Sequence, residues 1–163
     1  MTADDLIAVQ TLSVGIPAQA TLDLLEGDLG VRLSKLLTSV RVDIDMVEAA
    51  DLADGSPAHT AWQLLRDQPG IGWVTAGKLL ARKRPHLVPV YDQVVRCVLG
   101  RPESFWFDLH AALRSVNWAL HHELIALRQV AELPQTVSVL RICDVVLWMY
   151  HRTDHQQRSC IGA

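Results

Sequence analysis

The feature that most constrains the fold is the spacing of the apolar residues, which recur every three or four positions along much of the chain. In the segment 137–150, Val139, Ile142, Val146 and Met149 follow this helical spacing, and further apolar residues lie on the other side. No segment alternates apolar and polar residues as a half-buried strand does, and no internal repeat is found. The pattern predicts an all-α fold in which 137–150 forms a central helix.

Composition limits the class of protein further. Half of the 163 residues are hydrophobic, which is enough to bury the core of one domain spanning 1–163. The formal net charge of −3 excludes a protein that coats nucleic acid by bulk positive charge. The three cysteines have no close spacing and indicate neither a disulfide framework nor a metal motif, which fits a reducing cytoplasm. Since no leader or membrane-spanning run is found, we expect a cytoplasmic protein with no membrane partner.

Local capping patterns predict where several helices begin. Thr2 and Asp5 have the spacing of a capping box, and Pro17 ends the region of that first helix. Ser56 and Pro57 are typical of an N-cap and a first helical position, so a helix is expected from there to about residue 67. Further helices are expected at 18–26, 31–40, 44–52 and 105–133, the last with a break near residue 117. With the helices of the central motif this gives an orthogonal bundle of about eight helices.

The most informative segment is 68–80, which reads Gln-Pro-Gly-Ile-Gly-Trp-Val-Thr-Ala-Gly-Lys-Leu-Leu. Gly70 and Gly72 lie between two expected helices, where glycine lets the backbone turn tightly and approach a ligand closely. The first amides of the following helix have no partner inside that helix, and they attract a phosphate. The segment therefore predicts a phosphate-binding hairpin, and an ordinary tight turn is the alternative.

A cluster of basic residues accompanies this hairpin and is the only concentrated one in the chain. It consists of Lys78, Arg82, Lys83, Arg84 and His86. Helical spacing places Lys78 and Arg82 on one face of the second helix. We expect the cluster to form a basic patch that contacts DNA phosphates, with a solvated face as the alternative.

The same region resembles the helix-hairpin-helix motif of base-excision DNA glycosylases, from Pro69 to Gly100 within a segment of about 58–100. Pro-Gly-Ile-Gly is followed by Thr-Ala, an apolar helix and Pro-Val-Tyr-Asp, and Asp92 lies 20 positions after the second glycine. The resemblance implies that Gly70, Gly72 and Thr75 bind the DNA backbone. It also implies that Asp92 stabilises positive charge on the sugar of a flipped nucleotide while the base departs.

Two departures from the glycosylase pattern limit which activity and which cofactor the resemblance implies. Val74 occupies the position where lyase-competent members carry a lysine, so the resemblance implies a monofunctional DNA N-glycosylase without lyase activity. The cysteine loop that holds an iron–sulfur cluster in some members is absent, and no cofactor is expected. The whole sequence, from its opening Thr2–Leu6 to Leu140–Met149, also resembles an uncharacterised actinobacterial family, which supplies no function.

Several individual residues have two interpretations. Asp92 precedes a Gln-Val-Val segment, so it serves either as the catalytic carboxylate or as the N-cap of a helix. Trp73 and Tyr91 are the aromatic residues best placed to stack on a base. Asp144 lies in an apolar helix and is expected to pair with a donor such as Arg141 or Arg96.

A metal site is not expected from the histidines. His151 and His155 have the spacing of two ligands on one helix face, but no third ligand accompanies them. Three hypotheses for the function remain. The first is a DNA-binding protein of the glycosylase type, with base excision as its activity, that would be nucleoid-associated. The second is a non-catalytic hairpin that binds DNA or a protein, and the third is a helical interaction module with no nucleic-acid partner.

Overall fold

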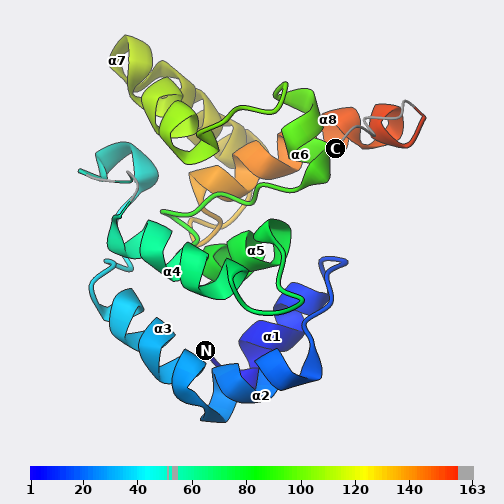
Figure 1. The fold of residues 1–163 in the computed structure, drawn as a ribbon. Helices are drawn as coiled ribbons and strands as arrows, with labels where there is room; N and C mark the ends of the chain where they lie inside the picture. Colours follow the sequence, from blue (N-terminus) through cyan, green and yellow to red (C-terminus); the bar gives the residue numbers. More distant parts are fainter. Residues whose placement is uncertain (51, 53–54, 158–163) are drawn as a thin grey trace. The chain divides into compact units, whose positions relative to one another are not determined.

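The computed structural model describes residues 1–50, 52 and 55–157, and the side chains up to residue 153. All regular structure in these residues is helical, which confirms the predicted all-α class (Figure 1). The α-helices are α1 (Ala3–Gln10), α2 (Ala18–Glu26), α3 (Asp28–Thr38), α4 (Pro57–Arg66), α5 (Trp73–Lys83), α6 (Gln93–Val98), α7 (Phe105–Val130) and α8 (Val139–Gln157). One 3-10 turn, η1, spans Met46–Glu48.

The contacts of the chain fall into two compact units. Unit 1 is Met1–Val88 and unit 2 is Pro89–Ala163. The sequence predicts one domain over 1–163 and one functional segment over about 58–100. The boundary falls inside that segment, so the hairpin belongs to unit 1 and Asp92 belongs to unit 2.

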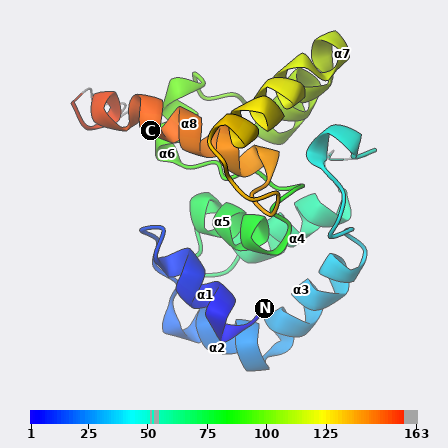
Figure 2. The same ribbon diagram turned by 180° about the vertical axis from the view of Figure 1, so that it is seen from behind.

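Unit 1 is built around α5. This helix packs against α1 and α4, while α3 packs against α2 and α4 (Figures 1 and 2). Every residue from Thr75 to Ala81 is buried, so α5 is enclosed on all sides by its neighbours. Leu33, Leu65, Leu79 and Leu80 form the centre of the core, each at most 1% exposed. The hairpin turn is thereby fixed to the most buried helix of the unit.

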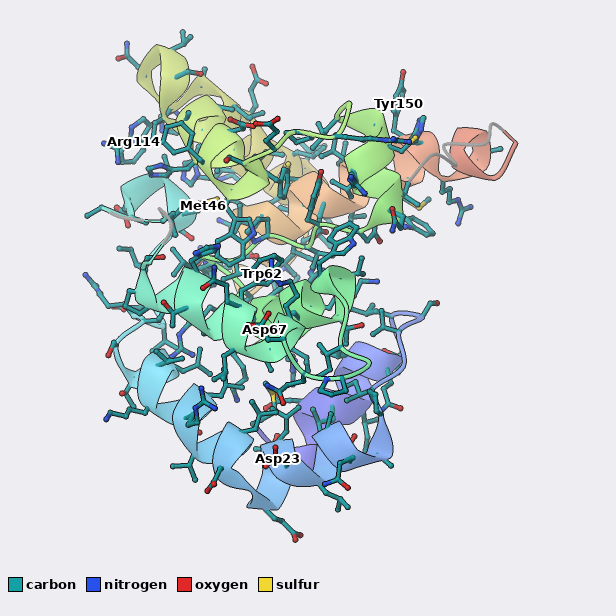
Figure 3. The ribbon with its side chains drawn as sticks, viewed as in Figure 1. Asp23, Met46, Trp62, Asp67, Arg114 and Tyr150 are labelled. Carbon is teal, nitrogen blue, oxygen red and sulfur yellow. The ribbon has the colours of Figure 1, made fainter. Side chains whose placement is uncertain are left out.

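Unit 2 consists of α6, α7 and α8, with α8 packed against both of the others. Its core includes Val95, Phe105, Leu113 and Ile142. The sequence analysis predicted that the last helix is central, and the structure confirms burial only for its first part. Tyr150 is 79% exposed and points away from α8 (Figure 3). The part of α8 around Met149 and Tyr150 therefore presents apolar side chains to solvent.

Local capping patterns placed helix ends well. The Thr2–Asp5 capping box is present, and the Ser56 hydroxyl accepts a hydrogen bond from the His59 amide at 3.3 Å. The interior of α7 has non-helical backbone angles from Ser115 to Trp118, which confirms the break expected near residue 117. The two caps depend on residues close together in the sequence, so they could be predicted without the tertiary structure.

Two predicted helices differ from those observed. Residue 51 of the helix expected at 44–52 lies outside the described residues, and the others form only η1. The Met46 amide donates to the carbonyl of His86, and the Asp45 carboxylate contacts the His86 ring at 2.8 Å. The helix expected at 31–40 already begins at Asp28, since the Asp23 carboxylate accepts a hydrogen bond from the Leu29 amide. In both cases a partner outside the predicted segment decides the local conformation.

Candidate functional site

A short turn connects α4 and α5 in the segment where the sequence predicts a hairpin. The turn is closed by a hydrogen bond from the Ile71 amide to the Gln68 carbonyl at 3.0 Å. Gly70 has a φ of +78°, in the left-handed region that favours glycine. A Cβ at this position would also lie 2.5 Å from the Pro17 side chain. Gly70 is therefore required by the backbone conformation and by the close approach of the segment before α2.

The N-terminus of α5 is open toward solvent at Gly72. This residue is the N-cap of α5, it is exposed, and no side chain makes a capping hydrogen bond there. A Cβ on Gly72 would meet no atom within 4 Å, and the first turn of α5 contains no acidic residue. Half-buried Val74 and buried Thr75 complete that turn. Because the first amides of a helix lack intrahelical partners, this end of α5 carries partial positive charge.

The basic residues of α5 do not form the exposed patch that the sequence analysis predicted. Lys78 is 8% exposed, and its Nζ donates to the carbonyl of Leu12 at 2.8 Å. Arg84 is 9% exposed, and its guanidinium donates to the carbonyls of Val40 and Leu37 at the end of α3. Burial lowers the pKa of the Arg84 guanidinium. These two cations connect α5 to the ends of α1 and α3.

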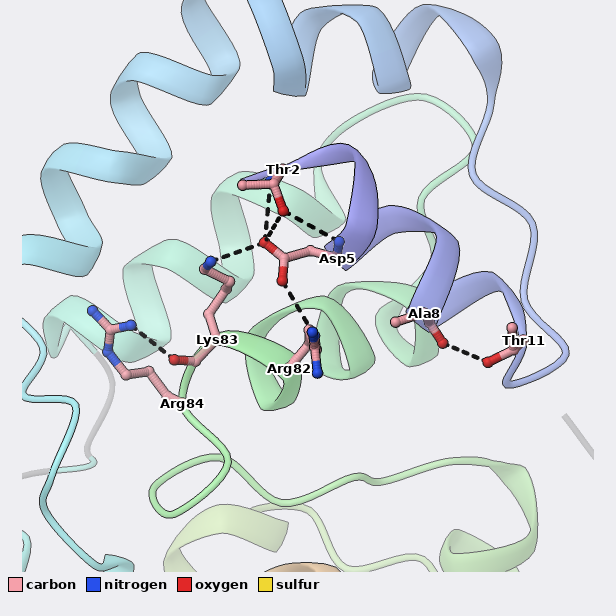
Figure 4. Close-up of polar contacts among 7 residues, drawn as sticks. All are labelled: Thr2, Asp5, Ala8, Thr11, Arg82, Lys83 and Arg84. Carbon is pink, nitrogen blue, oxygen red and sulfur yellow. Dashed lines mark hydrogen bonds and ion pairs between the residues drawn. The ribbon is translucent and has the colours of Figure 1, made fainter. Parts of the chain in front are cut away.

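Arg82 and Lys83 converge on the buried carboxylate of Asp5 in α1 (Figure 4). The Lys83 Nζ lies 2.8 Å from Oδ2, and the Arg82 Nε lies 3.2 Å from Oδ1. The Thr2 amide and hydroxyl also donate to Oδ2, at 3.1 and 3.0 Å. Burial alone raises the pKa of the Asp5 carboxyl, but the hydrogen bonds from Lys83 and Thr2 outweigh it and lower the pKa from 3.8 to about 2. Together with the His86–Asp45 pair, these contacts give each residue of the basic cluster an internal partner.

Aromatic residues lie along α4 and at the start of α5. The Trp62 Nε1 donates to the Trp73 carbonyl at 3.4 Å, and its ring stacks on His59 with centroids 5.8 Å apart. The Arg66 guanidinium lies 4.8 Å from the centroid of the Trp62 ring (Trp62 is labelled in Figure 3). Trp73 itself is half-buried. Trp62 was not among the predicted site residues, although its spacing from His59 and Arg66 places all three on one helix face.

A polar recess of about 360 Å³ lies between α3 and α4, and Gln68, at the start of the turn, is one of the residues that line it. Its walls include no aromatic side chain, so this recess does not fit the aromatic-lined cleft that a flipped base requires. The lining residues are Arg32, Thr60, Gln63, Leu64, Asp67 and Gln68.

Asp92 is the N-cap of α6 in unit 2. Its Oδ1 accepts hydrogen bonds from the amides of Val94 and Val95 at 3.0 and 3.1 Å. The side chain is half-buried. Tyr91, the neighbouring stacking candidate, is itself stacked on Phe105, with centroids 4.1 Å apart and an interplanar angle of 15°. Burial raises the pKa of the Tyr91 hydroxyl, and Arg96 opposes that effect. The capping interpretation of Asp92 is therefore observed directly.

The capping role gives a first prediction. Asp92→Ala should lower the free energy of unfolding by about 1 kcal/mol, whereas Asp92→Asn should change it little, because asparagine caps a helix nearly as well. Urea denaturation of the three proteins measures both effects. Release of uracil, oxidised guanine, alkylated adenine or mismatched adenine from duplex DNA tests catalysis in the same variants. A base-release activity that Asp92→Asn leaves unchanged would contradict a catalytic role for the carboxylate.

Other predicted residues of unit 2 have structural partners. The Asp144 carboxylate accepts a hydrogen bond from Arg141 at 3.1 Å, which confirms one of the two expected partners. Cys97 is disulfide-bonded, which corrects the expectation that the cysteines indicate no disulfide; Cys160 lies outside the described residues. The His151 ring lies 3.2 Å from the Cys97 sulfur.

No group of three metal-ligating side chains occurs in the described part of the chain, and the side chain of His155 lies outside that part. In the same residues, no helix combines the length and the apolar character of a membrane-spanning segment.

The helices, the hairpin and the caps define an all-α protein with a glycine-capped hairpin in its first unit. Residues 1–151 match the family of unknown function DUF6308, and the chain belongs to this family. Neither the curated proteins nor the solved structures give a match.

Proposed function

We propose that the α4–α5 hairpin binds the phosphate backbone of duplex DNA through the first amides of α5. The open N-cap at Gly72 carries this proposal, because it leaves the positive end of α5 without a side chain that neutralises it. The fixed turn at Gly70 supports the proposal, since a rigid turn costs less entropy on binding than a mobile loop. Phosphate contacts carry no sequence information, so little sequence preference is expected.

The amides are the proposed contacts because the cations of α5 have internal partners. Lys78 and Arg84 are buried, and Lys83 and Arg82 contact Asp5. A protein that neutralises few phosphates with lysine or arginine releases few counterions. The affinity for DNA should therefore be modest and should depend only weakly on salt.

Substitution of Gly72 tests the proposal without disturbing the core. Gly72 has a φ of −80° and a ψ of 171°, which any residue adopts, and a Cβ there meets open space. Gly72→Asp should cap α5 itself and repel phosphate, so DNA binding should weaken at least about tenfold. The free energy of unfolding should change by less than about 0.5 kcal/mol.

Gly72→Asn is the matched control for this experiment. Asparagine also caps the amides but brings no charge, so its effect on DNA binding should be smaller than that of Gly72→Asp. Fluorescence anisotropy of a labelled duplex at low salt measures both affinities. The proposal fails if the wild-type protein does not bind the duplex, or if Gly72→Asp binds it as well as the wild type does.

A base-excision activity with Asp92 as the catalytic carboxylate is the second candidate. The observation that favours it is the fixed orientation of the half-buried carboxylate, whose Oδ1 is held by the amides of Val94 and Val95. A carboxylate fixed in this way needs little reorganisation to stabilise positive charge on a sugar. The base-release assay with Asp92→Asn distinguishes this activity from a hairpin that binds DNA without catalysis.

A further inference from the structure

The interior of α7 contains an unusual backbone conformation. Val116, Asn117 and Trp118 have φ values of 47°, 54° and 65°, and Ser115 before them is extended, with a ψ of 156°. Left-handed residues other than glycine are disfavoured, and asparagine alone among these three adopts that conformation readily. A β-branched valine there is a genuine outlier. At the break α7 changes direction sharply (Figures 1 and 2). Three successive residues there are left-handed, and none of them is a glycine.

The sequence around the break has the pattern of one continuous helix. Apolar residues recur at steps of three or four from one side of the break to the other, without a change of phase. In the observed conformation Val116 is 82% exposed, although a straight helix would place it in line with its apolar neighbours. The apolar series is Phe105, Leu109, Leu113, Val116, Leu120, Leu124 and Leu127. A straight α7 would thus satisfy both the backbone preference and the apolar pattern.

A straight α7 conflicts with the packing of a single copy of unit 2. The residues before the break connect to α6, the residues after it connect to α8, and α8 packs against both α6 and α7. The His151 ring of α8 lies 3.2 Å from the Cys97 sulfur of α6. Straightening α7 would move α8 away from α6 and expose apolar side chains on both. These contacts can be restored if a second copy of the chain supplies its own α8.

We propose that Ser115–Trp118 is a hinge through which two copies of this chain exchange α8 and the second arm of α7. In the exchanged dimer each α7 is straight, and each α8 packs on the α6 of the other copy. Strain in a short hinge favours such an exchange, because opening relieves the strain while the core contacts are kept. The partner is a second copy of this chain, and the proposal is independent of DNA binding.

Hinge variants of the full-length protein test this proposal in both directions. Val116→Gly with Asn117→Gly stabilises the left-handed turn and destabilises the straight helix. The dissociation constant of the dimer should therefore rise at least about tenfold. Ser115→Ala with Asn117→Ala favours the straight helix and should stabilise the dimer at least about tenfold. Size-exclusion chromatography with light scattering, over a concentration series with a reductant present, measures the dissociation constants.

Val130→Gly is the matched control, because it removes an equally exposed valine, 82% exposed, at the far end of α7. The dissociation constant of the dimer should change little with this substitution. A distance between spin labels on non-canonical residues at positions 107 and 130 provides a second readout. In a straight helix the two positions are roughly 35 Å apart, and in the bent monomer they are closer. The proposal is overturned if the wild-type protein and the Ser115→Ala, Asn117→Ala variant stay monomeric to about 1 mM. It is also overturned if a dimer forms whose dissociation constant is the same in the wild type and in the hinge variants.

Discussion

Replacing Arg84 with alanine is expected to lower the free energy of unfolding by about 3 kcal/mol, the largest effect of any single substitution considered for this protein. Arg84 is 9% exposed, and its guanidinium donates to the backbone carbonyls of Leu37, Val40 and Lys83. Leu37 lies in the last turn of α3 and Val40 lies just beyond its end, where helix carbonyls have few intrahelical partners. Removal of the side chain would take the guanidinium donors away from these carbonyls and leave a cavity beside them.

Arg84→Lys should recover only part of this stability. A lysine ammonium keeps the positive charge, but it is a compact donor that does not match the planar arrangement of a guanidinium. Arg41→Ala is the control, because the Arg41 side chain is 68% exposed and pairs with Asp43 on the surface. Such an exposed pair contributes little to stability. Urea denaturation compares the three variants, and equal stabilities of Arg84→Ala and Arg41→Ala would contradict the capping role of Arg84.

Asp5→Asn is expected to lower the free energy of unfolding by about 2 kcal/mol at neutral pH. The Asp5 carboxylate is buried and accepts hydrogen bonds from Thr2, Arg82 and Lys83 (Figure 4). The pKa of the carboxyl is lowered from 3.8 to about 2 in the folded protein, and a difference of this size corresponds to about 2 kcal/mol. Asparagine keeps the shape and an acceptor oxygen but removes the charge that both cations contact.

The pH dependence of this difference follows from the direction of the pKa shift. Because the folded state lowers the pKa of Asp5, the stabilisation is fully present above pH 3.8 and is lost as the pH falls toward about 2. The wild-type protein and Asp5→Asn should therefore converge in stability at the acid end. Asp4→Asn is the control, since Asp4 is the exposed neighbour on the same helix. A difference between the wild type and Asp5→Asn that stays constant from pH 7 to pH 2 would contradict this account.

The candidate site shows where prediction from the sequence stops. The turn at Gly70 and the N-cap at Gly72 could be predicted, because glycines between two apolar helical segments indicate a hairpin. The internal partners of the basic residues could not be predicted, because long side chains reach acceptors that only the fold brings near them. Lys83 contacts Asp5 across 78 sequence positions, and Arg84 contacts Val40 across 44. Asp5 lies in α1 and Val40 lies just after α3, and local spacing does not encode that the fold brings either of them near these side chains.

The sequence by itself determined the helical class and most helix starts. Each of these depends on residues within about one helical turn, such as the amides of Val94 and Val95 that Asp92 caps. The tertiary structure alone decided that the boundary of the two units separates the hairpin from Asp92, and that the cations of α5 connect helices of unit 1. The physical reason is that periodicity and capping are local, whereas the partner of a buried charge is whichever group the packing places within hydrogen-bonding distance.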